Sequence, residues 1–217
     1  MIIDGLIINS PEYWEIRHQR EEWPRTSGWV QPLLKNIVPN RANVLEVGGG
    51  QGAFSWALLN ARPDLTIKCI DISPTAIERA QKLYTDVNLT FQIADVFNFT
   101  RDLRNEEYDY IISIQNFEHW PMNTHKEAFH QIWKRLKPGG KFFFTGVGQD
   151  WDLNKMNYST MNYRGNMVSI PNDYHYNKWS EQNFYDLCQT QKAKSVKFWR
   201  LRGKDRVVAE GEKDVGI

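Results

Sequence analysis

The chain has 217 residues and a formal net charge of +1, from 27 lysines and arginines against 26 acids. This length fits one α/β domain, so we expect a single domain over residues 1–217. The near balance of charge provides no general field that attracts nucleic acid. No stretch reaches the ~20 apolar residues of a membrane span, and the first residues lack the pattern of a targeting segment. We therefore expect a cytoplasmic protein without a membrane partner.

The two cysteines, Cys69 and Cys188, lie in apolar runs that have neither zinc-ligand nor disulfide spacing. We predict that both are buried, reduced thiols. Nine tryptophans are many for this length. Aromatic side chains in loops and at element ends often line ligand pockets. The tryptophans in such places are Trp14, Trp23, Trp120, Trp151 and Trp179.

Residues 11–38 carry apolar side chains at helical spacing, with Pro24 as a break. This pattern predicts one or two amphipathic helices ahead of the first strand. We interpret residues 1–40 as a helical cap or lid that packs on the edge of a sheet or covers a site.

An apolar run that ends at Val47 is typical of a strand buried on both faces. Four glycines follow within five positions: Gly48, Gly49, Gly50 and Gly52. They allow the backbone to turn sharply and to approach a ligand, and a helical pattern resumes at Ala53 with its free N–H groups facing the strand end. This is a nucleotide-binding pattern, although glycine-rich turns also occur without a ligand.

Strands and helices then alternate along the chain. Strands are predicted at 43–47, 65–70, 89–94, 108–114 and 141–147, and helices at 52–60, from Ser73 onward, and at 125–136. A crossover after each strand predicts a doubly wound, mostly parallel, Rossmann-like sheet with helices on both faces. After a long loop at 148–176 and a helix at 180–191, strands at 196–201 and 206–209 form an antiparallel hairpin, because only four residues join them.

Acidic residues occur near the ends of the first three strands, where ligands bind in such sheets. Asp71 is placed to accept hydrogen bonds from a ribose diol, and Asp95 to accept from an adenine amine, with Val96 beside the base. Glu46 can orient the glycine loop or meet an ammonium group. Each acid alone could be a helix cap or a solvated loop residue, but three acids at successive strands favour a ligand site.

These features resemble class I S-adenosylmethionine-dependent methyltransferases. The resemblance rests on Glu46-x-Gly48-x-Gly50-x-Gly52, on Asp71 and Asp95, on the Leu-Lys-Pro-Gly-Gly run at 136–140, and on the final hairpin. It implies a seven-stranded sheet and S-adenosylmethionine as cofactor, with the glycine loop against its methionine part, Asp71 on the ribose and Asp95 near the adenine. Ile72 is an expected cofactor contact on the same basis.

Residues 113–120 are similar to the segment after the fourth strand of small-molecule methyltransferases. Gln115 and Asn116 are therefore expected cofactor contacts, although Gln115 stands where the family usually has an acid. The resemblance implies methyl transfer to a small-molecule acceptor, and oxygen is the expected target atom.

His119 is the predicted catalytic base, because imidazole titrates near neutral pH and this residue follows the fourth strand. The alternative, a structural histidine at a helix start, is weighed equally. His125, His130 and His175 are weaker candidates. Glu118 and His119 could hold a divalent metal, as in relatives with a Glu-x-x-Glu-His pattern. Because Gln115 replaces the first carboxylate, we predict no metal.

The insertion at 148–178 is rich in aromatic residues and is predicted to shape the acceptor pocket; packing of a long loop is the alternative. The aromatic set there includes Trp151, Tyr158, Tyr163, Tyr174, His175, Tyr176 and Trp179.

Three other functions stay open on sequence alone. A nicotinamide-dependent oxidoreductase is suggested by Gly48-x-Gly50-x-x-Ala53 and by the Tyr174–Lys178 spacing, although the helical context there is poor. A nucleic-acid or protein methyltransferase is suggested by the basic residues of 192–206, which more often form a solvated strand edge. The third is a cofactor-binding subunit without catalysis. A homo-oligomer is compatible with the sequence.

Overall fold

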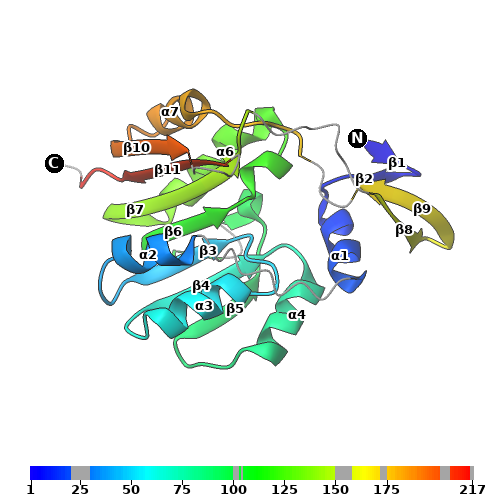
Figure 1. Cartoon of the computed structure of the whole chain (residues 1–217), viewed down its shortest axis with the longest axis horizontal. Coiled ribbons are helices and arrows are strands. Elements are labelled where there is room, and N and C mark those ends of the chain that lie inside the picture. The colour runs from blue at the N-terminus through cyan, green and yellow to red at the C-terminus, as the bar shows by residue number, and fades with distance from the viewer. Residues whose placement is uncertain are drawn as a thin grey trace.

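The computed structural model describes residues 1–20, 30–99, 103, 105–149, 158–171, 175–200 and 206–215. A seven-stranded sheet in the order β10-β11-β7-β6-β3-β4-β5 forms its centre (Figure 1). The strands are β3 (Asn43–Val47), β4 (Thr66–Asp71), β5 (Leu89–Ile93), β6 (Tyr108–Ile114), β7 (Leu136–Val147), β10 (Lys194–Arg200) and β11 (Arg206–Glu212).

Strands β3 to β7 pair in parallel, and β11 runs antiparallel to both of its neighbours, β7 and β10. The predicted doubly wound sheet and its final antiparallel hairpin are therefore confirmed. The chain continues from β3 to β4 on one side and returns with β6 on the other. The carboxyl end of β3 lies at this change of direction, which is where open α/β sheets bind ligands.

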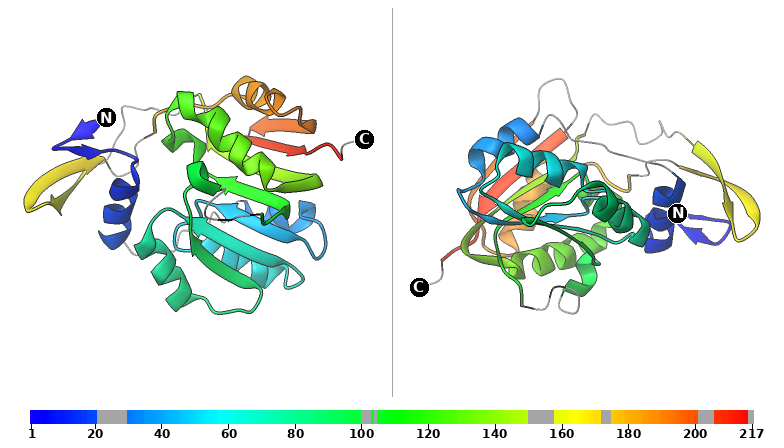
Figure 2. Two further views of the ribbon diagram at one scale, coloured as in Figure 1. Left: turned by 180° about the vertical axis from the view of Figure 1, so that it is seen from behind. Right: turned by 90° about the horizontal axis from the view of Figure 1, so that it is seen from below.

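Helices cover both faces of the sheet. The helices are α1 (Pro11–Arg20), α2 (Gln31–Ile37), α3 (Ala53–Ala61), α4 (Pro74–Leu83), α6 (His125–Lys134) and α7 (Glu181–Gln189). Tyr110 and Ile112 of β6 pack with α2 and α3, whereas Ile111 between them packs with α6 and α7. The alternation follows from the two-residue period of a strand. Figure 2 shows α6 and α7 on the face opposite to α2.

Helix α4 begins as its sequence predicts. Ser73 is the N-cap, its hydroxyl oxygen accepts a hydrogen bond from the Ala76 N–H at 3.1 Å, and Pro74 is the first helical residue. Two other boundaries were predicted wrongly: the helix expected at 125–136 ends at Lys134, and the strand expected from Lys141 already begins at Leu136. Both cysteines are buried free thiols, as predicted.

The predicted long loop at 148–176 is wrong, because it contains an antiparallel hairpin of β8 (Tyr158–Tyr163) and β9 (Asn166–Pro171). Arg164 and Gly165 form its turn at φ 50° and 87°, the conformation that suits a two-residue hairpin loop. The described buried side chains of this hairpin belong to a cluster with the N-terminal residues, separate from the two clusters of the main sheet. Its strands therefore lack the long apolar pattern by which the central strands are recognised.

The N-terminal cap is also not purely helical. Strands β1 (Ile2–Ile3) and β2 (Leu6–Ile7) form a hairpin around Asp4-Gly5. Its Leu6 packs with Tyr13 of α1 and with Val168 and Ile170 of β9. The Tyr13 hydroxyl donates to the Pro171 carbonyl at 2.7 Å. Residues 1–20 and 158–171 thus form one small unit beside the main sheet (Figure 1).

The segment 175–179 is attached to the carboxyl end of the sheet. The Trp179 N–H donates to the Val147 carbonyl at 2.7 Å, and the Trp179 ring stacks on Phe184 at 4.3 Å. Gly146 lies under this ring, because a Cβ at Gly146 would lie 2.7 Å from two ring carbons of Trp179. The absence of a side chain at position 146 therefore lets the segment pack on the sheet.

Replacing Gly146 by Ala tests this packing. Trp179 is only 2% exposed and held between neighbours, so the added methyl must displace it or distort β7. We expect Gly146→Ala to lower the free energy of unfolding by about 1–3 kcal/mol, as overpacking does. Urea denaturation measures this, and an unchanged midpoint and slope would show that the contact is not tight.

Candidate functional site

A pocket of about 490 Å³ lies at the carboxyl ends of the parallel strands. Its donor half, as we name it, is formed by the glycine loop, Asp71 and Asp95; its acceptor half by Gln115, His119, His175 and Arg206. Of the residues predicted to contact a cofactor or to act as base, all except Gly52 line it: Glu46, Gly48, Gly49, Gly50, Asp71, Ile72, Asp95, Val96, Gln115, Asn116 and His119. Gly52 instead begins α3 against Phe91.

The glycine loop is packed too closely for side chains at two positions. A Cβ on Gly48, at φ 70°, would lie 2.2 Å from the Asn116 amide nitrogen, and one on Gly49 would lie 2.3 Å from the Cys69 sulfur. Asn116 uses the same nitrogen to donate to the Val47 carbonyl at 2.6 Å. Asn116 therefore fastens the end of β3 to the loop that follows β6.

Asp71 holds the glycine loop from the end of β4. One carboxylate oxygen accepts from the Gly50 N–H at 2.8 Å, and the other accepts from the Ser73 N–H at 3.0 Å. Each carboxylate oxygen can accept more than one hydrogen bond, so both can also receive a ligand hydroxyl. The geometry is compatible with the predicted role of Asp71 on a ribose.

Asp95 caps the short helix η1 (Val96–Asn98). Its carboxylate accepts from the Phe97 N–H at 3.0 Å and from the Asn98 side-chain amide at 2.8 Å. Asp95 is therefore a helix cap, which is one of the interpretations that the sequence left open. It also lines the pocket.

Glu46 lies beneath the loop and is 4% exposed. Burial raises the pKa of its carboxyl to about 7, against hydrogen bonds from Ser55 and Cys69 that act to lower it. Its carboxylate lies directly under Gly49, where a Cβ would be 2.9 Å away. Glu46 therefore supports the glycine loop from below, as predicted for an organiser of that loop.

Helix α1 covers the donor half through contacts that the sequence did not signal. The Glu15 carboxylate accepts from the Ser73 hydroxyl at 2.6 Å and from the Thr75 N–H at 3.1 Å, at the start of α4. His18 lies against Gly50. Burial lowers the pKa of His18, although the nearby Asp71 charge opposes this shift.

Gln115 and Arg206 form a pair in the acceptor half. With its amide oxygen facing the guanidinium, Gln115 accepts from Arg206 Nη2 at 2.6 Å and Nε at 2.8 Å. Arg206 was predicted as part of a solvated basic edge; it instead lines the pocket. Sequence reasoning missed it because only the pairing of β11 with β7 brings the start of the last strand to this site.

Two other basic residues of this region have acidic neighbours. Lys194 forms an ion pair with Asp214, and Lys197 lies opposite Glu210 across β10 and β11. Phosphate contacts by these lysines would have to compete with the acids. Arg202 and Lys204 lie outside the described residues.

His119 lies in the pocket wall on η2 (Phe117–His119), with its ring 4.9 Å from both the Trp14 and His175 rings. His125 and His130 have other contacts. His125 Nε2 donates to the Phe117 carbonyl at 2.8 Å and so holds η2 in place. His130 contacts Gln191, two residues beyond the end of α7, and does not line the pocket.

The predicted aromatic lining is partly correct. Trp14 and Trp120 line the pocket, but Trp179 is buried against Phe117 and Phe184 behind it. Tyr163 belongs to the cluster of the two small hairpins. The calls on Trp23, Trp151 and Tyr174 lie outside the described residues. Within the described ranges, no helix is long and apolar enough to cross a membrane.

The raised pKa of Glu46 predicts a pH dependence of stability. Because the folded pKa exceeds the ordinary value, folding favours the protonated acid, and this stabilisation is lost as pH rises through about 7. Between pH 5 and pH 8, the free energy of unfolding of the wild type should fall by up to about 3 kcal/mol more than that of Glu46→Gln. Urea denaturation of both proteins at the two pH values tests this. Parallel pH profiles would contradict it.

The comparisons with known proteins agree with this geometry. Residues 44–140 match the family model of a methyltransferase domain. A malonyl-[acyl-carrier protein] O-methyltransferase 2 of Ilyobacter polytropus is 30% identical over 169 residues, which are 77% of this chain and 59% of that relative. A ubiquinone biosynthesis O-methyltransferase of Pseudomonas fluorescens is 26% identical over 140 residues, 59% of this chain and 58% of the relative. This chain thus spans less than two thirds of either relative.

Among solved structures, the complex of DhpI with SAH superimposes with a TM-score of 0.69 at 17% identity and covers 95% of this chain and 96% of that one. At this identity the match shows the fold alone. The sheet order, the glycine loop and the final hairpin are those expected of class I methyltransferases. Residues 44–140 of this chain therefore match a methyltransferase domain, within a chain that has the same fold as this solved structure.

Proposed function

We propose that the chain binds S-adenosylmethionine in this pocket and transfers its methyl group to an oxygen atom of a small-molecule acceptor. The observation that carries the proposal is a single pocket whose lining combines the glycine loop, Asp71 and Asp95 with His119, His175 and Arg206. Methyl transfer requires the two ligands to be held in line, and a two-sided pocket at the switch point provides for both. The O-methyltransferase names of the relatives support this choice.

In the donor half, the ribose diol donates to Asp71, and the adenine lies beside Val96 and Asp95. The methionine part lies against the glycine loop, which Glu46 and Asn116 hold from below and from the side. A positive ammonium group near Glu46 would favour its charged form and so lower its raised pKa. These assignments follow the class I pattern and use only residues that line the pocket.

In the acceptor half, a lone pair of the acceptor oxygen attacks the methyl carbon. The C–O bond forms as the C–S bond breaks, and its electron pair stays on sulfur, which loses its positive charge. A hydroxyl acceptor must also lose its proton, and we assign this to the His119 imidazole, which lies in the pocket wall.

A carboxylate acceptor is a second candidate, favoured by Arg206 in the acceptor half. A guanidinium recognises a carboxylate through paired hydrogen bonds, and Arg206 already presents Nη2 and Nε in this way to Gln115. The name of one relative contains a malonyl group, which has a free carboxylate. A carboxylate has no proton to lose at neutral pH, so the two acceptor classes differ in their need for His119.

Cofactor binding is tested by calorimetry with S-adenosylhomocysteine. We expect binding to the wild type and no binding of NADH, and Asp71→Asn should weaken the affinity at least about tenfold, because hydrogen bonds to a charged group contribute about 1.5–3 kcal/mol. Asp186→Asn is the control, since the Asp186 carboxylate accepts a hydrogen bond from the Gln182 amide on α7 and does not line the pocket. Binding of NADH in place of S-adenosylhomocysteine would refute the proposed cofactor.

The role of His119 is tested with two acceptor classes and labelled S-adenosylmethionine in metal-free buffer. With a phenolic acceptor, His119→Ala should lower turnover about 10²–10⁴-fold, the usual contribution of general base catalysis. With a malonyl thioester, the loss should be much smaller. His130→Ala should match the wild type with both. If His119→Ala retains full turnover of the hydroxyl acceptor, His119 is not the base.

A further inference from the structure

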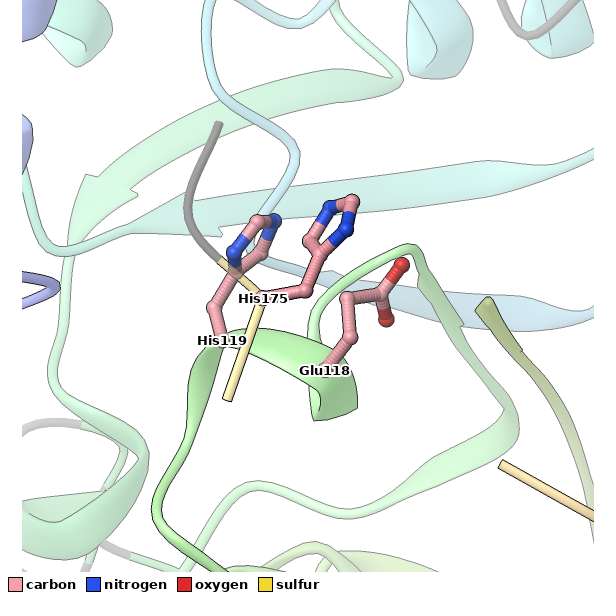
Figure 3. Close-up of side chains that lie close together, drawn as sticks. All are labelled: Glu118, His119 and His175. Atoms are coloured by element: carbon pink, nitrogen blue, oxygen red, sulfur yellow. The ribbon is translucent and has the colours of Figure 1, made fainter. Parts of the chain in front are cut away.

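Glu118, His119 and His175 bring their side chains together at one edge of the pocket (Figure 3). One donor atom from each lies within 4.8 Å of the others, and all three residues are buried. Figure 3 shows Glu118 and His119 rising from the short helix η2, with the His175 ring between them from a separate segment. A carboxylate and two imidazoles therefore converge from two parts of the chain.

Backbone contacts hold these two parts together. The Tyr176 N–H, next to His175, donates to the carbonyl of Glu118 at 2.7 Å. One residue further on, the Asn177 side-chain amide donates to the Trp120 carbonyl at 2.6 Å. His175 is thus placed beside η2 by its immediate neighbours, so the cluster does not depend on an exposed loop.

The donor set suits a divalent transition metal. Imidazole nitrogen and carboxylate oxygen are ligands for Zn²⁺, Mn²⁺ and Fe²⁺, and three protein ligands leave coordination positions open for water or substrate. Two donors that bind one ion at about 2.1 Å lie at most about 4.2 Å apart. In tetrahedral coordination the donors lie only about 3.4 Å apart, so donor atoms of the cluster must approach one another by up to about 1.4 Å through side-chain rotation. A cation there would also offset the cost of burying the Glu118 carboxylate.

We propose that Glu118, His119 and His175 form a divalent metal site in the acceptor half of the pocket. The sequence predicts no metal, because Gln115 replaces a carboxylate. In the structure the Gln115 amide pairs with Arg206, and the third ligand comes instead from His175, far along the chain. The absence of a carboxylate at position 115 therefore does not remove the ligand set.

This site refines the acceptor class and rests on the proposed methyl transfer. An acceptor hydroxyl bound to the ion loses its proton to solvent more readily, because the positive charge stabilises the oxyanion. The oxyanion then attacks the methyl carbon, the C–S bond breaks and its electron pair goes to sulfur. In the metal-bound protein His119 holds the ion, and it takes the proton itself only when no ion is bound. The preferred acceptor is a small molecule with a metal-binding hydroxyl.

Co²⁺ and Mn²⁺ are the probes for this site. Titration of the purified full chain with Co²⁺ should produce visible d–d absorption that saturates at one ion per chain. Pulsed electron paramagnetic resonance of the Mn²⁺ form should show coupling to imidazole nitrogen. Both use the wild type, so they do not depend on the folding of a variant. Binding without nitrogen coupling, or no saturable binding, would overturn the proposal.

His175→Ala and Glu118→Gln should each weaken Co²⁺ affinity by at least about tenfold. The control is His130→Ala, which should bind as the wild type does because His130 is neither in the cluster nor in the pocket lining. Equal affinity in all four proteins would also overturn the site. Calorimetry with S-adenosylhomocysteine in the presence of a chelator separates this proposal from the proposed function. Metal binding without S-adenosylhomocysteine binding refutes the function alone; the reverse refutes the metal site alone.

Discussion

The attachment of the glycine loop to the end of β4 is the constraint on which the site depends. The N–H groups of Gly48 and Gly49 donate to the Ile70 carbonyl at 2.8 and 3.0 Å, and the Gly50 N–H donates to Asp71. Three successive backbone donors are thus held by one strand end. The loop cannot move without breaking these bonds, so the donor half is preorganised before a ligand arrives.

The sequence predicts this part of the molecule well, because its determinants are local. Val47 and the glycines that follow it are neighbours in the chain, and Asp71 ends the next predicted strand. Parallel pairing with a crossover then brings both strand ends to one edge. Asn116 follows the same rule after the end of β6, and so does Gln115 of the acceptor half. Every residue found in this way lies at the carboxyl end of a strand or directly after it.

The acceptor half could not be predicted equally well, because long-range contacts build it. His175 is held at the pocket by the hydrogen bond from the Tyr176 N–H to the Glu118 carbonyl. Arg206 is brought there by the register of β11 against β7. The short hairpins β1–β2 and β8–β9 were missed for a related reason: their buried side chains pack on each other instead of on the sheet. No periodicity in the chain reveals such contacts.

Helix α1 connects the donor half, which local sequence determines, with the acceptor half, which long-range contacts build. Glu15 accepts hydrogen bonds from Ser73 and Thr75 at the start of α4, and Trp14, one residue earlier, packs its ring edge against His119. Tyr13 in turn donates to Pro171 of the inserted hairpin. Three consecutive side chains therefore contact the start of α4 beside the donor half, the acceptor half and the insertion. Because a helix turn is rigid, any shift of α1 that loosens Glu15 must also move Trp14 against His119, so the position of α1 and the shape of the acceptor half are mechanically linked.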